Sequence, residues 1–136
     1  MNSTTQTLQL IRHHLLGVSA VTDIVSDRVH TAHFYDFENL NVIFPLVVIE
    51  QTGGVGNYGM KAQRVEIEVY CYARDSSQKS KQLYDAVYQN LNGAGLKNSN
   101  VSVAGYVYEQ TRPTSGFNPA AQAFYCSGTF IINTAG

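Results

Sequence analysis

The sequence predicts an α+β domain: an antiparallel sheet of four to five strands with two main helices packed on one face, in the order α-β-β-β-α-β-β. Two patterns carry this prediction. Residues 64–72 alternate apolar with polar or aromatic side chains, the period of two that a half-buried strand imposes. Residues 83–91 repeat apolar side chains every three or four positions, which is typical of a helix. A chain of 136 residues fits one core, so we expect residues 1–136 to form a single domain.

The first helix is predicted from about Thr5 to Leu16. Its apolar residues Leu8, Ile11 and Leu15 are spaced three and four apart, so they share one face that can lie against the sheet. Gly17 follows as the stop signal, since glycine ends helices more readily than it continues them.

A short helical turn is predicted over residues 19–25, then a brief strand over residues 28–31. Residues 45–52 read PLVVIEQT, a β-branched run whose proline stands at the first residue, where a strand tolerates it. This run is expected to pair with residues 64–72. The connection, residues 53–63, contains four glycines and no apolar period, which predicts a long, mobile hairpin loop.

Asp75 or Ser76 is expected to cap the second helix, and Gly93 is expected to end it. Two strands follow, over residues 101–111 and 122–133. Between them, residues 112–121 read RPTSGFNPAA, whose two prolines and one glycine predict a turn-rich loop.

The predicted core lies where the helices meet the sheet. Its members are Leu8, Ile11, Leu15, Leu83, Val87 and Leu91 from the helices, with Val47, Ile49, Val65, Ile67, Val69, Phe124, Phe130 and Ile132 from the strands. Cys71 and Cys126 fall on the apolar sides of their strands, and the chain has no CxxC pair. We therefore expect two buried, reduced thiols that react slowly.

Composition narrows the function. Nine Lys and Arg against ten Asp and Glu give a net charge of −1, which lacks the basic footprint of a protein that holds nucleic acid. Residues 1–20 have no basic head before their apolar run, so a secretory signal is not expected. No stretch reaches the length of a membrane span, and we expect a reducing cytoplasm.

Gly54, Gly56 and Gly59 match the G-x-G-x-x-G pattern of nucleotide-binding loops. The dinucleotide form of that motif needs a helix to begin at the glycines, because helix N-terminal amides hold the pyrophosphate. An alternating strand follows here instead, and the lysine strand, HRD and DFG segments of kinases are missing. The pattern therefore predicts a hairpin connection.

Two other groups of polar residues are candidate sites. His30, His33 and Asp36 cluster in sequence but follow no known metal-ligand spacing, so a solvated loop explains them. Glu66 and Glu68 share one strand face about 7 Å apart, a separation that suits paired catalytic carboxylates but is more typical of a solvated or interface surface. The sequence predicts no catalytic, cofactor-binding or metal-binding residue, and no enzyme activity.

Several segments resemble the tail-terminator, or tail-completion, proteins of long-tailed bacteriophages. In that family a segment ending in an Arg-Val pair, here Arg28 and Val29, precedes a strand that opens with x-Pro and a polar strand-to-helix join. The resemblance covers nearly the whole chain and rests on order and hydrophobicity. The segments are VSAVTDIVSDRVH after the first helix, FPLVVIEQT, RVEIEVYCYARDSSQKSKQLYDAVYQNL and FYCSGTFIINT.

The resemblance implies a structural virion protein that forms a ring of six subunits on the end of the tail tube. Such a ring caps tube polymerisation, joins the tail to the neck and leaves a passage for DNA. The implied partners are further copies of the chain, the tail tube protein and a neck or head-completion protein. DNA only passes through, and no membrane or cofactor is involved. The implied location is the tail or neck of a virion that assembles in the host cytoplasm.

The family's function is spread over surfaces, so the resemblance assigns regions. Two regions are expected to contact neighbouring subunits or the tube, and one strand face is expected to line the passage. The contact residues are Gly54, Val55, Asn57, Tyr58, Lys61, Arg112, Phe117 and Asn118, and the lining residues are Glu66 and Glu68.

Two other hypotheses stay open. A different virion connector, such as a head-closure, neck or tube protein, could share this sheet. A small-ligand binder or enzyme would need a concave pocket with converging polar groups, expected around His30, His33 and Glu66.

Overall fold

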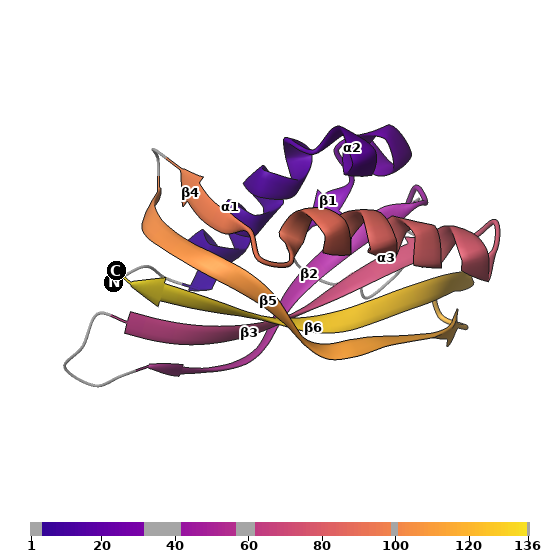
Figure 1. The fold of residues 1–136 in the computed structure, drawn as a ribbon. Coiled ribbons are helices and arrows are strands. Elements are labelled where there is room, and N and C mark those ends of the chain that lie inside the picture. The colour runs from indigo at the N-terminus through magenta and orange to yellow at the C-terminus, as the bar shows by residue number, and fades with distance from the viewer. Residues whose placement is uncertain (1–3, 32–41, 57–61, 99–100, 136) are drawn as a thin grey trace.

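The computed structural model describes residues 4–31, 42–56, 62–98 and 101–135. Three helices lie together over one face of a single curled sheet (Figure 1). The helices are α1 (Thr4–Leu16), α2 (Ser19–Val25) and α3 (Ser77–Leu91). The strands are β1 (Val29–His30), β2 (Leu46–Gly56), β3 (Ala62–Ala73), β4 (Gly95–Asn98), β5 (Val101–Asn118) and β6 (Ala123–Ala135).

The α+β class is confirmed, but the sheet differs from the expected one. It has six strands in the order β1-β2-β3-β6-β5-β4, and β1 pairs parallel with β2, so the sheet is mixed rather than antiparallel. β1 contributes only Val29 and His30, and so short a strand carries no sequence signal for its direction. The short turn after α1 is a third helix, and β4 forms directly after the glycine that ends α3.

Two predicted loops are largely strand. β2 continues through Gly56 and β3 begins at Ala62, so the glycine-rich segment mostly extends the hairpin. β5 runs to Asn118, and only residues 119–122 turn into β6. The strand accommodates Pro113 and Gly116 in two ways, whereas Pro119 lies in the turn. Its register with β6 shifts on either side of Thr111, and Gly116 lies beneath the Tyr125 ring, where a Cβ would stand 2.8 Å from the hydroxyl.

The main core forms between the helices and the sheet, as expected. Val65, Ile67 and Val69 are buried on the helix side of β3, and Leu83, Val87 and Leu91 come from α3. Leu8 packs at the margin and is only partly buried. Phe124 does not belong to this core. It lies toward the far end of the hairpin, where its ring contacts Phe117 at 5.2 Å between centroids.

A second apolar cluster covers the opposite face of the sheet at one end. Leu46 and Val48 alternate along β2 with the core residues Val47 and Ile49, so their side chains point the other way. They pack with Tyr72, Ala121 and Ala123, and the Arg74 guanidinium lies 4.3 Å over the Phe44 ring. At this end, the sheet face turned away from the helices is therefore covered by side chains from the strands and from the segments next to them.

Ser76 caps α3: its hydroxyl oxygen accepts a hydrogen bond of 3.1 Å from the backbone N–H of Lys79. Replacing Ser76 with Ala is expected to lower the free energy of unfolding by about 1 kcal/mol, because that N–H loses its partner. Ser77→Ala, one position into the helix and exposed, is the matched control and should change stability by much less. Chemical denaturation of the two variants measures the difference, and equal stabilities would contradict the capping role.

Within the described part of the chain, no helix combines the length and hydrophobicity that crossing a membrane requires.

Candidate interaction surfaces

Three carboxylates lie on the sheet face turned away from the helices. Glu50 on β2 stands directly opposite Glu68 on β3, and Glu66 lies two residues further along the same face. Their neighbours in sequence, Ile49 and Ile67, are buried on the helix side. We call Glu50, Glu66 and Glu68 the acidic face. Like charges directly across a strand pair repel one another, so this arrangement is not explained by sheet stability.

Neighbouring polar groups hold two of these carboxylates. The Tyr70 hydroxyl donates a hydrogen bond of 2.8 Å to Glu68, and the Arg64 guanidinium lies 3.4 Å from Glu66. Burial raises the pKa of Tyr70 well above its ordinary value, and the bond to Glu68 raises it further. The phenol therefore stays protonated and serves as the hydrogen-bond donor to Glu68.

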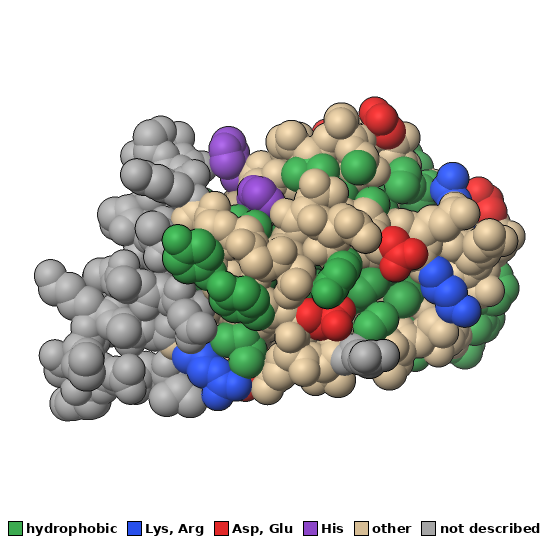
Figure 2. Space-filling model, viewed as in Figure 1, with side chains coloured by type: hydrophobic (Ala, Val, Ile, Leu, Met, Phe, Trp, Pro, Cys, Tyr) green, Lys and Arg blue, Asp and Glu red, His purple; other side chains and the backbone are tan. Residues whose placement is uncertain are grey.

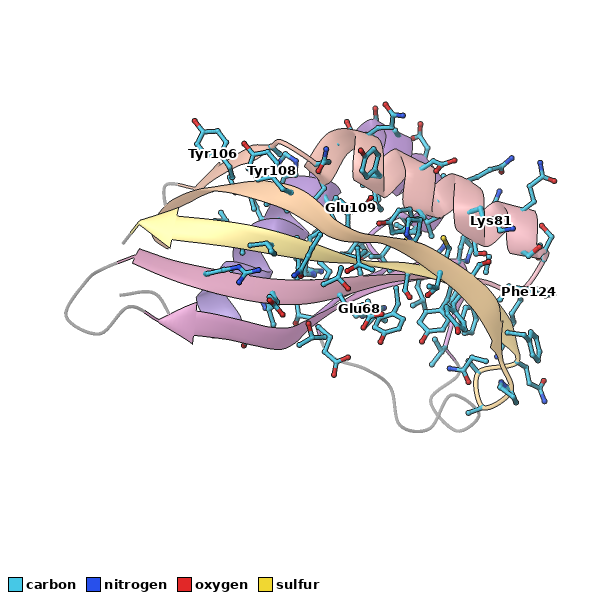
Figure 3. All side chains as sticks on the ribbon, turned by 60° about the horizontal axis from the view of Figure 1, so that its bottom comes forward. Glu68, Lys81, Tyr106, Tyr108, Glu109 and Phe124 are labelled. Atoms are coloured by element: carbon cyan, nitrogen blue, oxygen red, sulfur yellow. The ribbon has the colours of Figure 1, made fainter. Side chains whose placement is uncertain are left out.

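Tyrosines extend the exposed surface along β5. Tyr106 and Tyr108 are 60% and 51% exposed, while Val107 between them is fully buried. Figure 3 shows their side chains next to one another close to β4, well apart from Glu68 on β3. Hydrophobic side chains gather over this half of β5 in the space-filling view (Figure 2). Large apolar rings held on a strand and exposed to solvent are typical of surfaces that meet other proteins.

The outer edge of β5 lacks a partner strand over its second half. β4 pairs with β5 only as far as Tyr106, and the side chain of Asn92 accepts the N–H of Glu109 at 2.7 Å. Beyond that point, no described strand pairs with the outer edge of residues 110–118, which we call the β5 outer edge. Pro113, Thr114 and Ser115 are all exposed on this stretch.

The opposite side of the sheet is also open. β1 covers β2 only at Val47 and Val48. Among the described strands, none pairs with the outer edge of β2 from Gln51 to Gly56, which we call the β2 outer edge. An open strand edge presents unpaired backbone groups that can accept another strand.

The predicted contact residues fall on these two edges. Gly54 and Val55 belong to β2, where they pair with Val65 and Arg64 of β3. Asn57, Tyr58 and Lys61 lie outside the described residues. The other predicted group, Arg112, Phe117 and Asn118, belongs to β5. The two groups are not brought together, because they lie at opposite ends of the sheet.

Within the second group, the residues differ in what they do. Phe117 is 52% exposed, as a contact residue should be. Asn118 instead holds the hairpin turn, since its side-chain oxygen accepts hydrogen bonds from the N–H groups of Ala120 and Ala121 at 3.0 and 3.3 Å. Glu50, Tyr106 and Tyr108 are not among the residues predicted from the sequence. The β2–β3 register brings Glu50 opposite Glu68, and alternation with the buried Val107 leaves both tyrosines exposed on β5.

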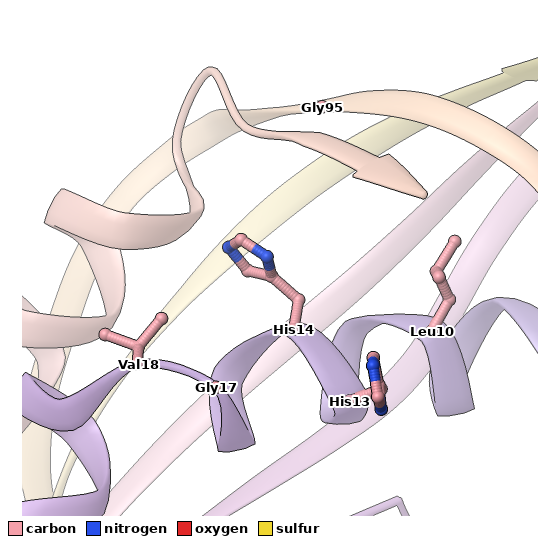
Figure 4. A pocket seen from close by; sticks show the side chains of 6 residues that line it. All are labelled: Leu10, His13, His14, Gly17, Val18 and Gly95. Carbon is pink, nitrogen blue, oxygen red and sulfur yellow. The ribbon is translucent and has the colours of Figure 1, made fainter. Parts of the chain in front are cut away.

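A cavity of about 320 Å³ lies between α1 and β4 (Figure 4). His13 and His14 both line it, but they project from α1 in different directions, so they do not converge on one ligand. The Nε2–H group of His14 donates to the carbonyl of Asn90 at 2.7 Å, which ties α1 to the end of α3. This histidine has a structural role.

A second hollow, of about 260 Å³, lies between α3 and β5 and is lined by Tyr84, Asp85, Tyr88, Glu109 and Pro113. The Tyr84 hydroxyl donates to Glu109 at 2.7 Å. Burial and this carboxylate raise the pKa of Tyr84 far above its ordinary value. This hydrogen bond holds α3 against β5, so we assign Tyr84 and Glu109 a structural role.

Of the residues expected to line a pocket, His33 lies outside the described residues, and His30 and Glu66 are not brought together. His30 pairs with Val48, which pairs with Tyr70, and Glu66 lies four residues further along β3. Burial lowers the pKa of His30, with a smaller effect from Arg12. Across the described ranges, no three His, Cys, Asp or Glu side chains are grouped to hold a metal ion.

No protein-family model matches the sequence, and no curated protein matches it. Among solved structures, a chain in the virion of a native gene transfer agent particle has a similar fold. The TM-score is 0.69 at 14% sequence identity, and the match covers 98% of this chain and 100% of that one. At this identity the likeness shows a shared fold over the full length of both chains.

Proposed function

We propose that this chain is a structural protein of a phage-like virion, which forms a ring at the end of the tail tube and joins the tail to the neck. The observation that carries the proposal is the fold match to a chain of a virion, which covers 98% of this chain and 100% of that one. The sequence resemblance to tail-terminator proteins points to the same kind of particle.

The two open edges support assembly into a ring. The β5 outer edge and the β2 outer edge lie on opposite sides of the sheet and differ in sequence, so pairing one with the other joins copies head to tail. A head-to-tail contact closes into a ring when the rotation between neighbouring subunits is a whole fraction of a full turn. Pairing also removes two open edges that would otherwise promote aggregation.

Thr114→Lys tests this interface. A lysine on an open strand edge discourages strand pairing, because its charge would lose water on contact with a neighbour. Since Thr114 is exposed, the variant should melt like the parent but form fewer rings. Gln82→Lys, exposed on α3, makes the same charge change away from the edge and should assemble normally. Native mass spectrometry compares the two, and full assembly of Thr114→Lys would place the interface elsewhere.

The acidic face fits the lining of a DNA passage. Carboxylates repel phosphates, so DNA can slide past without lasting contacts. The double variant Glu66→Lys, Glu68→Lys should make assembled rings retain double-stranded DNA at low salt, whereas parent rings should not. Asp23→Lys with Asp27→Lys makes an equal charge change at exposed positions on and next to α2. If both double variants bound DNA equally, net charge alone would explain the result and the acidic face would not line the passage.

A head-closure or neck ring is the second candidate, because the fold match to a virion chain supports it equally. The two roles predict different particles when the protein is missing. Loss of a terminator leaves tubes of irregular length, whereas loss of a neck ring leaves tubes of normal length without heads.

A further inference from the structure

The two cysteines of the chain stand directly opposite each other in the sheet. Cys71 on β3 and Cys126 on β6 are register partners, so their side chains leave the sheet on the same side. That side is the helix face, where Cys71 is fully buried and Cys126 is 4% exposed. Both are free thiols. The sequence places each on an apolar face, but only the register brings them together.

Opposed positions in an antiparallel pair suit a disulfide. Their Cα atoms lie about 4.5 or 5.5 Å apart, depending on whether the pair exchanges hydrogen bonds. Disulfides span Cα separations of about 4.4–6.8 Å, so either kind of pair falls within the range. The Cα separation of opposed residues is therefore compatible with a bond between Cys71 and Cys126.

The surroundings control how fast the thiols react. Burial raises the pKa of both, and the nearby Cys126 raises that of Cys71 further. Cys126 lies closer to solvent, with Asp85 and Lys81 of α3 near it. The thiolate is the reactive form, so oxidation is slow at neutral pH and begins more readily at Cys126.

We propose that Cys71 and Cys126 form an oxidation site that closes a cross-strand disulfide between β3 and β6 in the native fold, with a small peroxide as the oxidant. The Cys126 thiol loses its proton and the thiolate attacks one peroxide oxygen, so that an S–O bond forms and the O–O bond breaks. The product is a sulfenic acid, and the hydroxide that leaves takes up a proton to become water. The Cys71 sulfur then attacks the sulfenic sulfur, the S–S bond forms and a second water leaves. Two thiols and one hydrogen peroxide thus give one disulfide and two waters.

The bond would link β3 and β6, the two central strands of the sheet. In the sequence, β3 comes directly before α3, whereas β6 follows α3, β4 and β5. Closing a long loop stabilises a fold mainly by restricting the unfolded chain. The biological setting, but not the chemistry, rests on the proposed function: a virion assembles in a reducing cytoplasm and is then released into oxidising surroundings.

The test treats the native chain with hydrogen peroxide and then maps peptides without reduction, at neutral pH and at a raised pH. We expect a linked pair of peptides containing Cys71 and Cys126, which forms faster at the raised pH. The oxidised protein should melt at a higher temperature than the untreated protein, and a reducing agent should return the melting temperature to its original value. Cys71→Ser should leave a sulfenic acid on Cys126 that dimedone traps. Because the test uses the isolated chain, its outcome does not depend on the virion role.

Three outcomes would overturn the proposal. One is overoxidation of Cys126 without any linked peptide. Another is a linked peptide that forms only in denaturant, and the last is a linked protein that melts at a lower temperature than the reduced one. The proposal is likewise overturned if the native chain shows no change after exposures that fully oxidise the unfolded chain, because the native thiols then do not react with the peroxide.

Discussion

Leu83→Asp is expected to leave the protein unfolded or aggregated. Leu83 is fully buried in the main core, where α3 packs on the sheet. A carboxylate there would lose its water without gaining a partner, at a cost of several kcal/mol. A domain of this size is stable by only about 5–15 kcal/mol, so one such change removes much or all of the margin. Val69→Asp, at a fully buried position on β3, should behave alike.

Gln82→Asp is the matched control for Leu83→Asp, because it puts the same side chain one position away on the exposed side of α3. It should stay soluble and melt cooperatively near the parent temperature. Circular dichroism during heating distinguishes the variants. Cooperative, soluble folding of both core variants would show that α3 does not pack on β3 as described.

Gly128→Ala should destabilise the fold by about 3 kcal/mol, the upper part of the range for overpacked cores. An added Cβ would overlap the Tyr84 hydroxyl oxygen and stand 2.7 Å from the ring carbon that bears it. Tyr84 is 2% exposed and its hydroxyl is bonded to Glu109, so the ring cannot move without breaking that bond. Glycine at this position lets α3 approach β6.

Gly95→Ala is the control for Gly128→Ala. Its Cβ would meet only the exposed Tyr106 ring, at 3.4 Å, and that side chain can move into solvent. Urea denaturation should show a small change for Gly95→Ala and a large one for Gly128→Ala. Equal effects would mean that Tyr84 does not lie over Gly128.

Elements with a strong local pattern could be predicted from the sequence. The alternation in β3 and the apolar stripe of α3 depend on each segment alone, and both are present with the expected buried faces. The parallel β1–β2 pair could not be predicted, because direction is set by a connection and not by Val29 or His30. The long β5 was missed because Pro113 and Gly116 are turn residues in most contexts, and only the bulged pairing with β6 makes them strand residues.

Some residues of the candidate surfaces could likewise be predicted from a local pattern, and others could not. The outward placement of Glu66 and Glu68 followed from the strand period alone. Glu50 joins them only through the β2–β3 register, and the Cys71–Cys126 pair exists only through the β3–β6 register. Register between strands is a tertiary property, so the local pattern of one segment does not specify it.

The most direct test of the terminator role is electron microscopy of particles produced without this protein. A terminator ring limits the length of the tube and provides the surface that joins it to the neck. We predict unjoined heads and tails, with tubes of irregular length, and recovery of joined tails of one length when the protein is supplied. Joined tails of uniform length in its absence would contradict the proposal.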